Sequence, residues 1–231
     1  MLGSSLEDKE SDDDTICLGD SIFVNRDYEL TTFTFGRHSL RLLCLRSAST
    51  DYDLTGQVVW PGAVLLNNYL TENAGMLHGC SIIELGSGVG ITGILCSRFC
   101  HEIVLTDHNV EIIRKNIELQ SSLDDPCSAG LSALKLEWGN SDQLSKILQE
   151  HPAGFDLSSI PPLFSTVEKL LLFRGGKCKF ILAYVSRAKN MDAMIVDEAL
   201  KHGMQISEVQ GTRSVIANLE GVIFEITMQS S

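Results

Sequence analysis

The stretch SIIELGSGVGITG, residues 81–93, constrains the fold of this 231-residue chain more strongly than any other. It reads as a short buried strand, a glycine-rich turn and the start of a helix. Such a turn lets the backbone approach a ligand closely, and the N–H groups that open the helix attract polar ligand atoms. The stretch therefore predicts a nucleotide-binding α/β domain.

Hydrophobic periodicity predicts alternating strands and helices from residue 80 onward. Strands are predicted over 80–85, 102–107, 131–138, 178–185 and 221–228. Helices are predicted over 91–99, 110–120, 141–150 and 191–203, and within 158–176, where serine would cap the helix and proline would occupy its first turn. This alternation predicts a doubly wound, mostly parallel sheet with helices on both faces. Ligands on such sheets bind beyond the carboxyl ends of the strands, where the glycine turn falls.

The segment before this alternation predicts an N-terminal β-hairpin. Residues 28–45 alternate apolar and polar side chains on both sides of Gly36, with Phe33 and Phe35 on one face. A polar connector follows, and Pro61 opens a short predicted helix. The hairpin would lie at the front of the α/β domain.

The acidic charge of the chain is concentrated at its beginning. The net charge is -12, and residues 1–20 hold seven acidic side chains against one lysine. A leader of this composition is expected to be disordered. The acidity argues against nucleic acid as a partner, because binding phosphates requires a basic surface. No apolar run approaches the roughly 18 residues of a membrane span, so neither a membrane anchor nor a secretory signal is expected.

Seven cysteines are scattered along the chain without a CxxC pair. An odd number without framework spacing indicates reduced thiols and a cytoplasmic location, with the nucleus as a second compartment. Cys96 and Cys100 lie beside His101, but they fall in a helical pattern that favours buried small side chains over metal ligands. No metal site is therefore expected.

Two kinds of nucleotide compete for the glycine turn. Gly88, Gly90 and Gly93 have the spacing of the dinucleotide fingerprint, and Asp107 follows at the end of the next predicted strand, where it could bind ribose hydroxyls. That spacing alone is weak evidence for a dinucleotide. Glu84 ends the first strand, and a carboxylate there is unfavourable beside a pyrophosphate but favourable beside a cationic cofactor. No lysine completes a triphosphate-binding loop, which argues against a nucleoside triphosphate. Together with Glu84, this favours a nucleotide cofactor that carries positive charge.

The motifs together resemble a known family. Residues 82–90, IIELGSGVG, resemble motif I of the class I, S-adenosylmethionine-dependent methyltransferases. Trp60 in VVWPGA, Asp107 in LTDHN and Trp138 in KLEWGN together resemble the family-16 branch, which comprises non-histone protein-lysine methyltransferases. The resemblance implies a Rossmann-like single domain over 21–231. Within it, 21–55 would be the hairpin and connector and 56–231 the cofactor-binding core.

The resemblance also implies roles around the methionine portion of S-adenosylmethionine. Gly86, Ser87 and Gly88 would bring the backbone close to that portion, as only small residues allow. Glu84 would lie near its amino group. The alternative for Glu84 is a solvated acid at the end of a strand.

Three further residues would bind the rest of the cofactor. Asp107 would accept both ribose hydroxyls, Trp138 would stack against the adenine, and Trp60 would line the pocket beside the substrate entrance. Each has an alternative. Asp107 could balance a helix dipole, Trp138 could be an ordinary core residue, and Trp60 could pack the hairpin onto the domain.

The stretch GFDLSSIPPLF, residues 154–164, interrupts the pattern. A central strand is expected here beside the 80–85 strand, and such strands usually have about five or six nearly continuous apolar residues. The sequence offers only Phe155, Asp156 and Leu157 before two serines and two prolines, and proline cannot extend a strand.

Members of the resembled family continue here through apolar residues into an Ala-Asp-x-x-Tyr-like segment that reaches the active site. We therefore hypothesise an internal deletion of about one strand's length near 157–158, as in a splice variant. A natural rearrangement in which Asp156 ends a short strand is the alternative. Each buried backbone group left unpaired would cost about 1–3 kcal/mol, so marginal stability or activity is expected. Asp156 precedes the missing segment and is not assigned a catalytic role.

The function implied by the resemblance is methyl transfer from S-adenosylmethionine to a lysine of a protein substrate. Two alternatives stay open: a methyltransferase of small metabolites, and an inactive methyltransferase-like protein that binds a partner. No catalytic base is assigned. Five histidines are expected on the surface or in turns, namely His38, His78, His101, His108 and His151.

Overall fold

The computed structural model of the protein describes residues 28–46, 56–121, 130–152, 157–159, 164–173, 175, 177–186 and 189–229. The strands are β1 (Tyr28–Phe35), β2 (His38–Leu45), β3 (Ser81–Leu85), β4 (Glu102–Asp107), β5 (Gly130–Lys135), β6 (Leu157–Ser159), β7 (Lys179–Val185), β8 (Met204–Glu208), β9 (Ser214–Ile216) and β10 (Leu219–Met228). The helices are α1 (Pro61–Glu72), the 3-10 turn η3 (Ala74–Leu77), α2 (Ile91–Cys96), α3 (Glu111–Ser121), α4 (Ser141–Glu150), α5 (Phe164–Phe173) and α6 (Lys189–Lys201).

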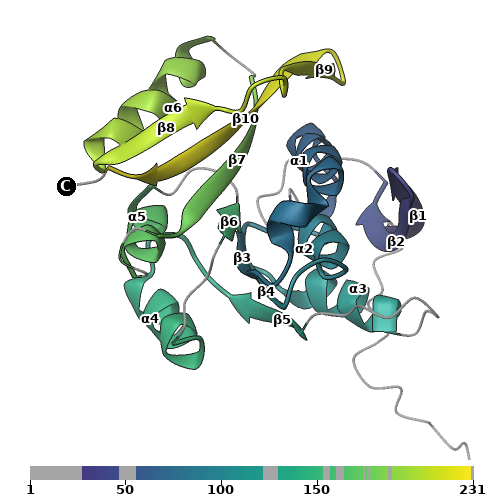
Figure 1. Ribbon diagram of the computed structural model, residues 1–231. Helices are drawn as coiled ribbons and strands as arrows, with labels where there is room; N and C mark the ends of the chain where they lie inside the picture. The colour runs from purple at the N-terminus through teal and green to yellow at the C-terminus, as the bar shows by residue number, and fades with distance from the viewer. Residues whose placement is uncertain are drawn as a thin grey trace, which may run out of the picture.

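The main sheet has the strand order β5-β4-β3-β6-β7-β10-β8, with β9 paired to β10 (Figure 1). The pairs among β3, β4, β5, β6 and β7 are parallel, whereas β10 is antiparallel to β7, β8 and β9. The strand order reverses between β3 and β6, which both lie in the middle of the sheet. The predicted doubly wound, mostly parallel sheet is confirmed.

Helices cover both faces of this sheet (Figure 1). On one face, α1, α2 and α3 bury a cluster that includes Leu66, Ile94 and Leu105. On the other face, α4, α5 and α6 bury a second cluster that includes Val104 and Leu171. Neighbouring positions of β4, Val104 and Leu105, therefore point into different cores, as the two-residue period of a strand requires.

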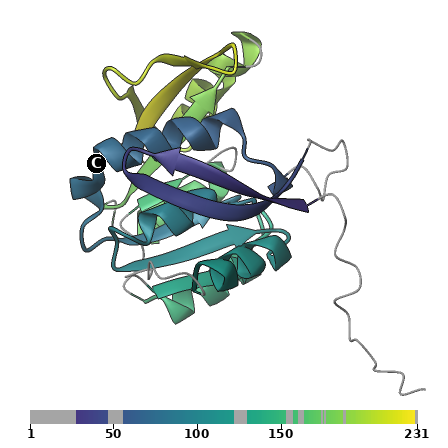
Figure 2. The same ribbon diagram turned by 90° about the vertical axis from the view of Figure 1, so that its right-hand side faces the viewer.

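The predicted hairpin over 28–45 is confirmed as β1 and β2, which pair from Tyr28 with Leu45 to Phe35 with His38. Its turn uses Gly36 at a φ of 56°, a conformation that glycine adopts without steric cost. The two strands form a separate sheet outside α1, α2 and α3 (Figures 1 and 2). Phe35 and Leu42 are buried beneath it.

Several predicted boundaries differ from the structure. β5 ends at Lys135 rather than at residue 138, so Trp138 lies in the turn that follows. α2 ends at Cys96 rather than at residue 99. Ser158 and Ser159 belong to β6 and do not cap α5, which begins at Phe164. β8 and β9 were not predicted.

A central strand is present beside β3, as expected. β6, described over Leu157–Ser159, pairs with Ile82–Glu84 of β3 and with Lys179–Ile181 of β7, while Phe155 lies outside the described residues. Within the described chain, the rest of β7 therefore has no strand partner on its β6 side. Asp156 and the leader over 1–20 lie outside the described residues.

In the ranges that the structure describes, no helix combines the length and the apolar character needed to cross a bilayer. The described cysteines are free thiols. Burial of Cys96 and Cys100 agrees with their expected packing role, and burial raises the pKa of the Cys100 thiol to about 12. A protonated thiol is a poor metal ligand.

Candidate functional site

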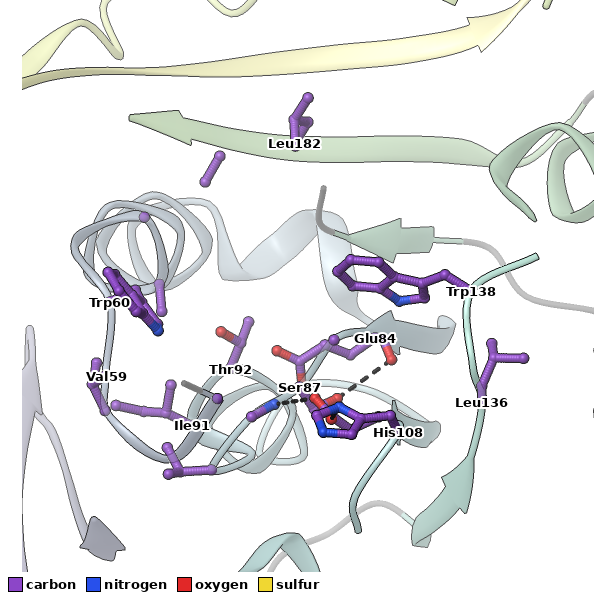
Figure 3. A pocket seen from close by; sticks show the side chains of 18 of the residues that line it. Val59, Trp60, Glu84, Ser87, Ile91, Thr92, His108, Leu136, Trp138 and Leu182 are labelled. Carbon is purple, nitrogen blue, oxygen red and sulfur yellow. Dashed lines mark hydrogen bonds and ion pairs between the residues drawn. The ribbon is translucent and has the colours of Figure 1, made fainter. Parts of the chain in front are cut away.

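A cavity of about 1530 Å³ opens at the carboxyl ends of β3, β4, β5 and β7. It lies where the strand order reverses, as parallel α/β sheets predict for a ligand site. Pockets for single ligands usually measure about 300–1,000 Å³, so this one has room beyond a nucleotide. Figure 3 shows its interior, with Trp60 and Trp138 on opposite sides and Leu182 on β7 above them.

The glycine loop between β3 and α2 lines the base of the cavity. Gly86, Gly88 and Gly90 have φ values of 69°, 56° and 84°, which other residues rarely adopt. The loop is closed by hydrogen bonds from Gly90 N to Ser87 O at 2.8 Å and from Ser87 N to Thr106 O at 2.9 Å.

Two neighbours make side chains impossible at particular points of this loop. A Cβ atom on Gly88 would collide with the backbone carbonyl oxygen of Gly56, and one on Gly86 would lie 2.9 Å from Cζ2 of Trp138. The segment that begins at Gly56 thus lies against the loop from one side and Trp138 from another. The predicted need for glycine at 86 and 88 therefore has a direct steric cause.

Ser87 is buried and holds the loop to the sheet. Its hydroxyl accepts a hydrogen bond from Thr106 N at 3.1 Å and donates one to the carbonyl oxygen of Glu84 at 3.3 Å. It also lines the cavity. The side chain thus fixes the backbone of the glycine loop against β4.

Asp107 ends β4 and reaches the cavity with only 7% of its surface exposed. Its Oδ2 accepts a hydrogen bond from Gly88 N at 2.9 Å, so the carboxylate lies beside the glycine loop. α3 begins only at Glu111, and it is Asn109 Oδ1 that accepts from Glu111 N, at 3.1 Å. Asp107 Oδ1 also accepts a hydrogen bond from Asn109 N at 3.3 Å, two residues before α3 begins.

His108 is the site residue that the sequence did not single out. Its Nδ1 lies 2.7 Å from Oδ1 of Asp107, and the ring lines the cavity (Figure 3). His108 lies in the bend after β4 with its side chain 28% exposed, as a turn histidine was expected to, and it also lines the cavity. Its position directly after Asp107 was the only available signal.

Glu84 lies beneath the glycine loop and is only 2% exposed, so the alternative of a solvated strand-end acid is wrong. Its Oε2 accepts a hydrogen bond from Gly93 N at 2.9 Å, in the first turn of α2. Burial raises the pKa of Glu84 to about 7, and the Gly93 hydrogen bond opposes that rise. The carboxylate also borders the cavity.

The raised pKa of Glu84 predicts a specific pH dependence of stability. From its ordinary pKa of 4.5 up to about 7, the folded state keeps a proton that the unfolded state loses. The contribution of Glu84 to the free energy of unfolding should therefore fall by about 3 kcal/mol as the pH rises through that window. In the neutral variant Glu84→Gln this dependence is absent, so the variant should gain stability relative to wild type with rising pH.

Urea unfolding between pH 4.5 and 8.5 measures this difference, with exposed Glu118→Gln on α3 as the control. The Glu118 variant should follow wild type at every pH. Parallel curves for wild type and Glu84→Gln would show that Glu84 titrates normally.

The two tryptophans are partly exposed within the cavity. Trp138 is 41% exposed, so the alternative of an ordinary core residue is wrong. Trp60 is 36% exposed and immediately precedes α1, where its carbonyl accepts a hydrogen bond from Ala63 N at 2.9 Å. Val59 and Ala63 pack against the core beside the hairpin, whereas the Trp60 indole lines the cavity.

The charges that line the cavity favour a cationic ligand. Its described lining holds the carboxylates of Asp107, Glu111 and Glu137, the buried acid Glu84 and one lysine, Lys135. Lys135 forms an ion pair with Glu137 at 2.8 Å. A pyrophosphate would be repelled by this lining, while a sulfonium and an ammonium group would be attracted.

The residues present therefore fit S-adenosylmethionine better than a dinucleotide. The glycine loop admits a ligand close to its backbone, Asp107 offers an acceptor for a diol, and Trp138 offers an aromatic face. Among the described residues, no group of three histidine, cysteine or acidic side chains could hold a metal ion.

The side of the cavity formed by β7 is apolar (Figure 3). Leu182 and Tyr184 of β7 and Val167 of α5 line it. In the described chain, the pairing of β6 with β7 reaches Ile181, one residue before Leu182.

Comparison with known proteins agrees with this geometry. A family model described as lysine methyltransferase matches residues 43–196. The protein N-lysine methyltransferase METTL21A of Mus musculus is 32% identical over 157 residues, which cover 64% of this chain and 66% of that protein. The protein-lysine N-methyltransferase EFM3 of Chaetomium thermophilum is 27% identical over 149 residues, covering 57% of this chain and 43% of that protein.

Among solved structures, the T. thermophilus 16S rRNA methyltransferase RsmC in complex with AdoMet and guanosine has a TM-score of 0.58. It is 16% identical and covers 87% of this chain and 51% of its own, a likeness that shows a shared fold. The matches to METTL21A and EFM3 span two thirds or less of those proteins.

Proposed function

Because this chain belongs to the lysine methyltransferase family, we propose that it binds S-adenosylmethionine and transfers its methyl group to a lysine of a protein substrate. The family predicted from the sequence motifs is confirmed, and S-adenosylmethionine is the cofactor of that family. The observation that carries the proposal is a single cavity with an acidic end, formed by the glycine loop and Asp107, and an apolar end formed by β7.

The acidic end would hold the cofactor. Asp107 would accept hydrogen bonds from the ribose hydroxyls, and Trp138 would lie against the adenine. Gly86, Ser87 and Gly88 would face the methionine portion, with the Glu84 carboxylate beneath them. S-adenosylmethionine supplies an electrophilic methyl carbon bound to a sulfonium sulfur.

The apolar end would receive the lysine. Its aliphatic stem would lie along apolar side chains such as Leu182, and Trp60 would border the entrance. An apolar environment disfavours the charged ammonium, which lowers the pKa of the amine and favours its nucleophilic form. These residues would hold the amine against the methyl carbon that the cofactor supplies, and the proton of the amine would be lost to solvent because no base is assigned.

Methyl transfer can be measured with S-adenosylmethionine labelled in its methyl group and a protein extract as the substrate source. We expect label in protein, located on lysine by mass spectrometry. The control extract has its lysines blocked by reductive dimethylation and should take up no label. Label in small metabolites alone would contradict a protein substrate.

A second candidate function rests on the three residues of β6. A protein that binds S-adenosylmethionine but lacks part of the wall beside the acceptor could act as a binding protein without turnover. Reinsertion of a strand-length segment after Ser159 separates the two candidates. Activity that appears only after reinsertion would favour the internal deletion and the inactive form.

The same proposal places the protein in the cytosol or nucleus. Seven scattered cysteines without a CxxC pair support this location, because such thiols stay reduced in those compartments.

A further inference from the structure

We propose that Asn116 is a positioning residue for the cofactor loop, and that its side-chain amide couples the N-terminal hairpin to that loop. Asn116 lies on α3 and is completely buried. It lies outside the cavity lining, so any effect on the cofactor must act through other residues. The inference rests on the proposed cofactor site.

The amide of Asn116 makes three hydrogen bonds to the backbone of two separate segments. Its Oδ1 accepts from Leu43 N at 2.7 Å, and its Nδ2 donates to Leu43 O at 3.1 Å. The same Nδ2 donates to Val89 O at 2.9 Å. Leu43 belongs to β2, whereas Val89 lies in the glycine loop.

The bond to Val89 acts at the most adaptable point of the loop. Val89 lies between Gly88 and Gly90, both at positive φ. Because glycine has no Cβ atom, the peptide groups beside these two residues can rotate more easily than elsewhere. Because the Val89 carbonyl is held from outside, the peptide plane that it shares with Gly90 is fixed. The Gly88 N–H, one residue earlier, is the group that bonds to Asp107.

Only an amide satisfies this arrangement. A carboxylate would lose both donors, and an apolar side chain would leave the buried carbonyl of Val89 without this partner. The hairpin is consequently joined to the loop through one side chain, and the order of one segment should affect the other.

Gln120, one helical turn further along α3, provides a matched control. It is also buried, and its Nε2 donates to Arg41 O of β2 at 2.7 Å. No described hydrogen bond joins Gln120 to the glycine loop. Gln120 thus anchors the same hairpin strand from the same helix without reaching the cofactor site.

The test compares Asn116→Ala with Gln120→Ala in the full chain, first without cofactor. We expect faster hydrogen exchange at the Gly90 amide in the Asn116 variant and a wild-type rate in the Gln120 variant. With S-adenosylmethionine, the dissociation constant should rise about 10-fold or more for Asn116→Ala and stay near wild type for Gln120→Ala. Equal effects of the two variants on both measurements would overturn the inference.

Two further measurements keep the test decisive. Should Asn116→Ala fail to fold, Asn116→Asp is the second variant. It keeps the acceptor for Leu43 N and removes the donor to Val89 O, so faster hydrogen exchange at the Gly90 amide is again expected. In wild type, S-adenosylmethionine should slow exchange of the Leu43 amide, and an unchanged rate counts against coupling. Absence of cofactor binding by wild type would refute the proposed function alone, because Gly90 exchange without cofactor still tests the role of Asn116.

Discussion

Replacing Gly88 by alanine is expected to raise the dissociation constant for S-adenosylmethionine by about 100-fold or more and to destabilise the fold by about 2–4 kcal/mol. The residue has a φ of 56°, which costs a residue with a Cβ atom about 1 kcal/mol. The added Cβ would also collide with the carbonyl oxygen of Gly56, which is backbone and cannot rotate away. The loop would have to move, and Gly88 N would leave Asp107.

Gly203→Ala separates these two causes. Gly203 has a similar φ of 67°, but a Cβ atom there would meet no other atom within 4 Å. This variant should lose only about 1 kcal/mol and bind the cofactor as wild type does. Urea unfolding and calorimetric titration measure both quantities. Similar cofactor affinities for the two variants would contradict the steric role of Gly88.

Asp107→Ala is expected to weaken S-adenosylmethionine binding by about 100-fold. Two charge-assisted hydrogen bonds to the ribose would be lost, each worth about 1.5–3 kcal/mol. The variant also leaves Gly88 N without its carboxylate partner. Asp107→Asn keeps an acceptor for Gly88 N and should lose less affinity.

Glu102→Ala is the matched control for Asp107, because it removes a carboxylate from the opposite end of the same strand. Glu102 pairs with His151 at 3.2 Å and lies outside the cavity lining. Its variant should bind the cofactor normally in the same titration. Normal cofactor binding by Asp107→Ala would contradict the proposal that Asp107 binds the ribose hydroxyls.

The sequence predicted the parallel part of the fold well because its signals are local and strong. The strand over 102–107 is an apolar run whose predicted boundaries match β4, and the alternation around Gly36 predicted both hairpin strands. The antiparallel edge was missed. β8 has only Met204 buried among mostly exposed positions, and β9 has three residues that depend on pairing with β10.

The sequence predicted which residues would belong to the site, but not the contacts between their side chains. The motif residues do gather around one cavity, because the carboxyl ends of parallel strands meet at one sheet edge. The helix over 110–120 was predicted, but the link of Asn116 to Leu43 and Val89 joins segments that are distant in sequence. The segment at Gly56 was missed for the same reason, whereas His108 was missed because no motif marks it apart from its position after Asp107.

The short β6 strand has the largest consequence for function. The sequence showed that apolar residues end early, and the described part of β6 pairs with β7 as far as Ile181, next to Leu182 in the cavity lining. The residues proposed to bind the cofactor lie after β3 and on β4, on the other side of β6 from β7. Cofactor binding should therefore survive the short strand even if methyl transfer does not.

The central claim is that the acid-lined cavity binds S-adenosylmethionine. Calorimetric titration of the full chain with S-adenosylmethionine, and separately with NAD, tests it most directly. We expect saturable binding of S-adenosylmethionine at one site and no heat with NAD, because the carboxylates around the glycine loop repel a pyrophosphate. Binding of NAD in preference to S-adenosylmethionine, or of neither by a cooperatively folded chain, would contradict the claim.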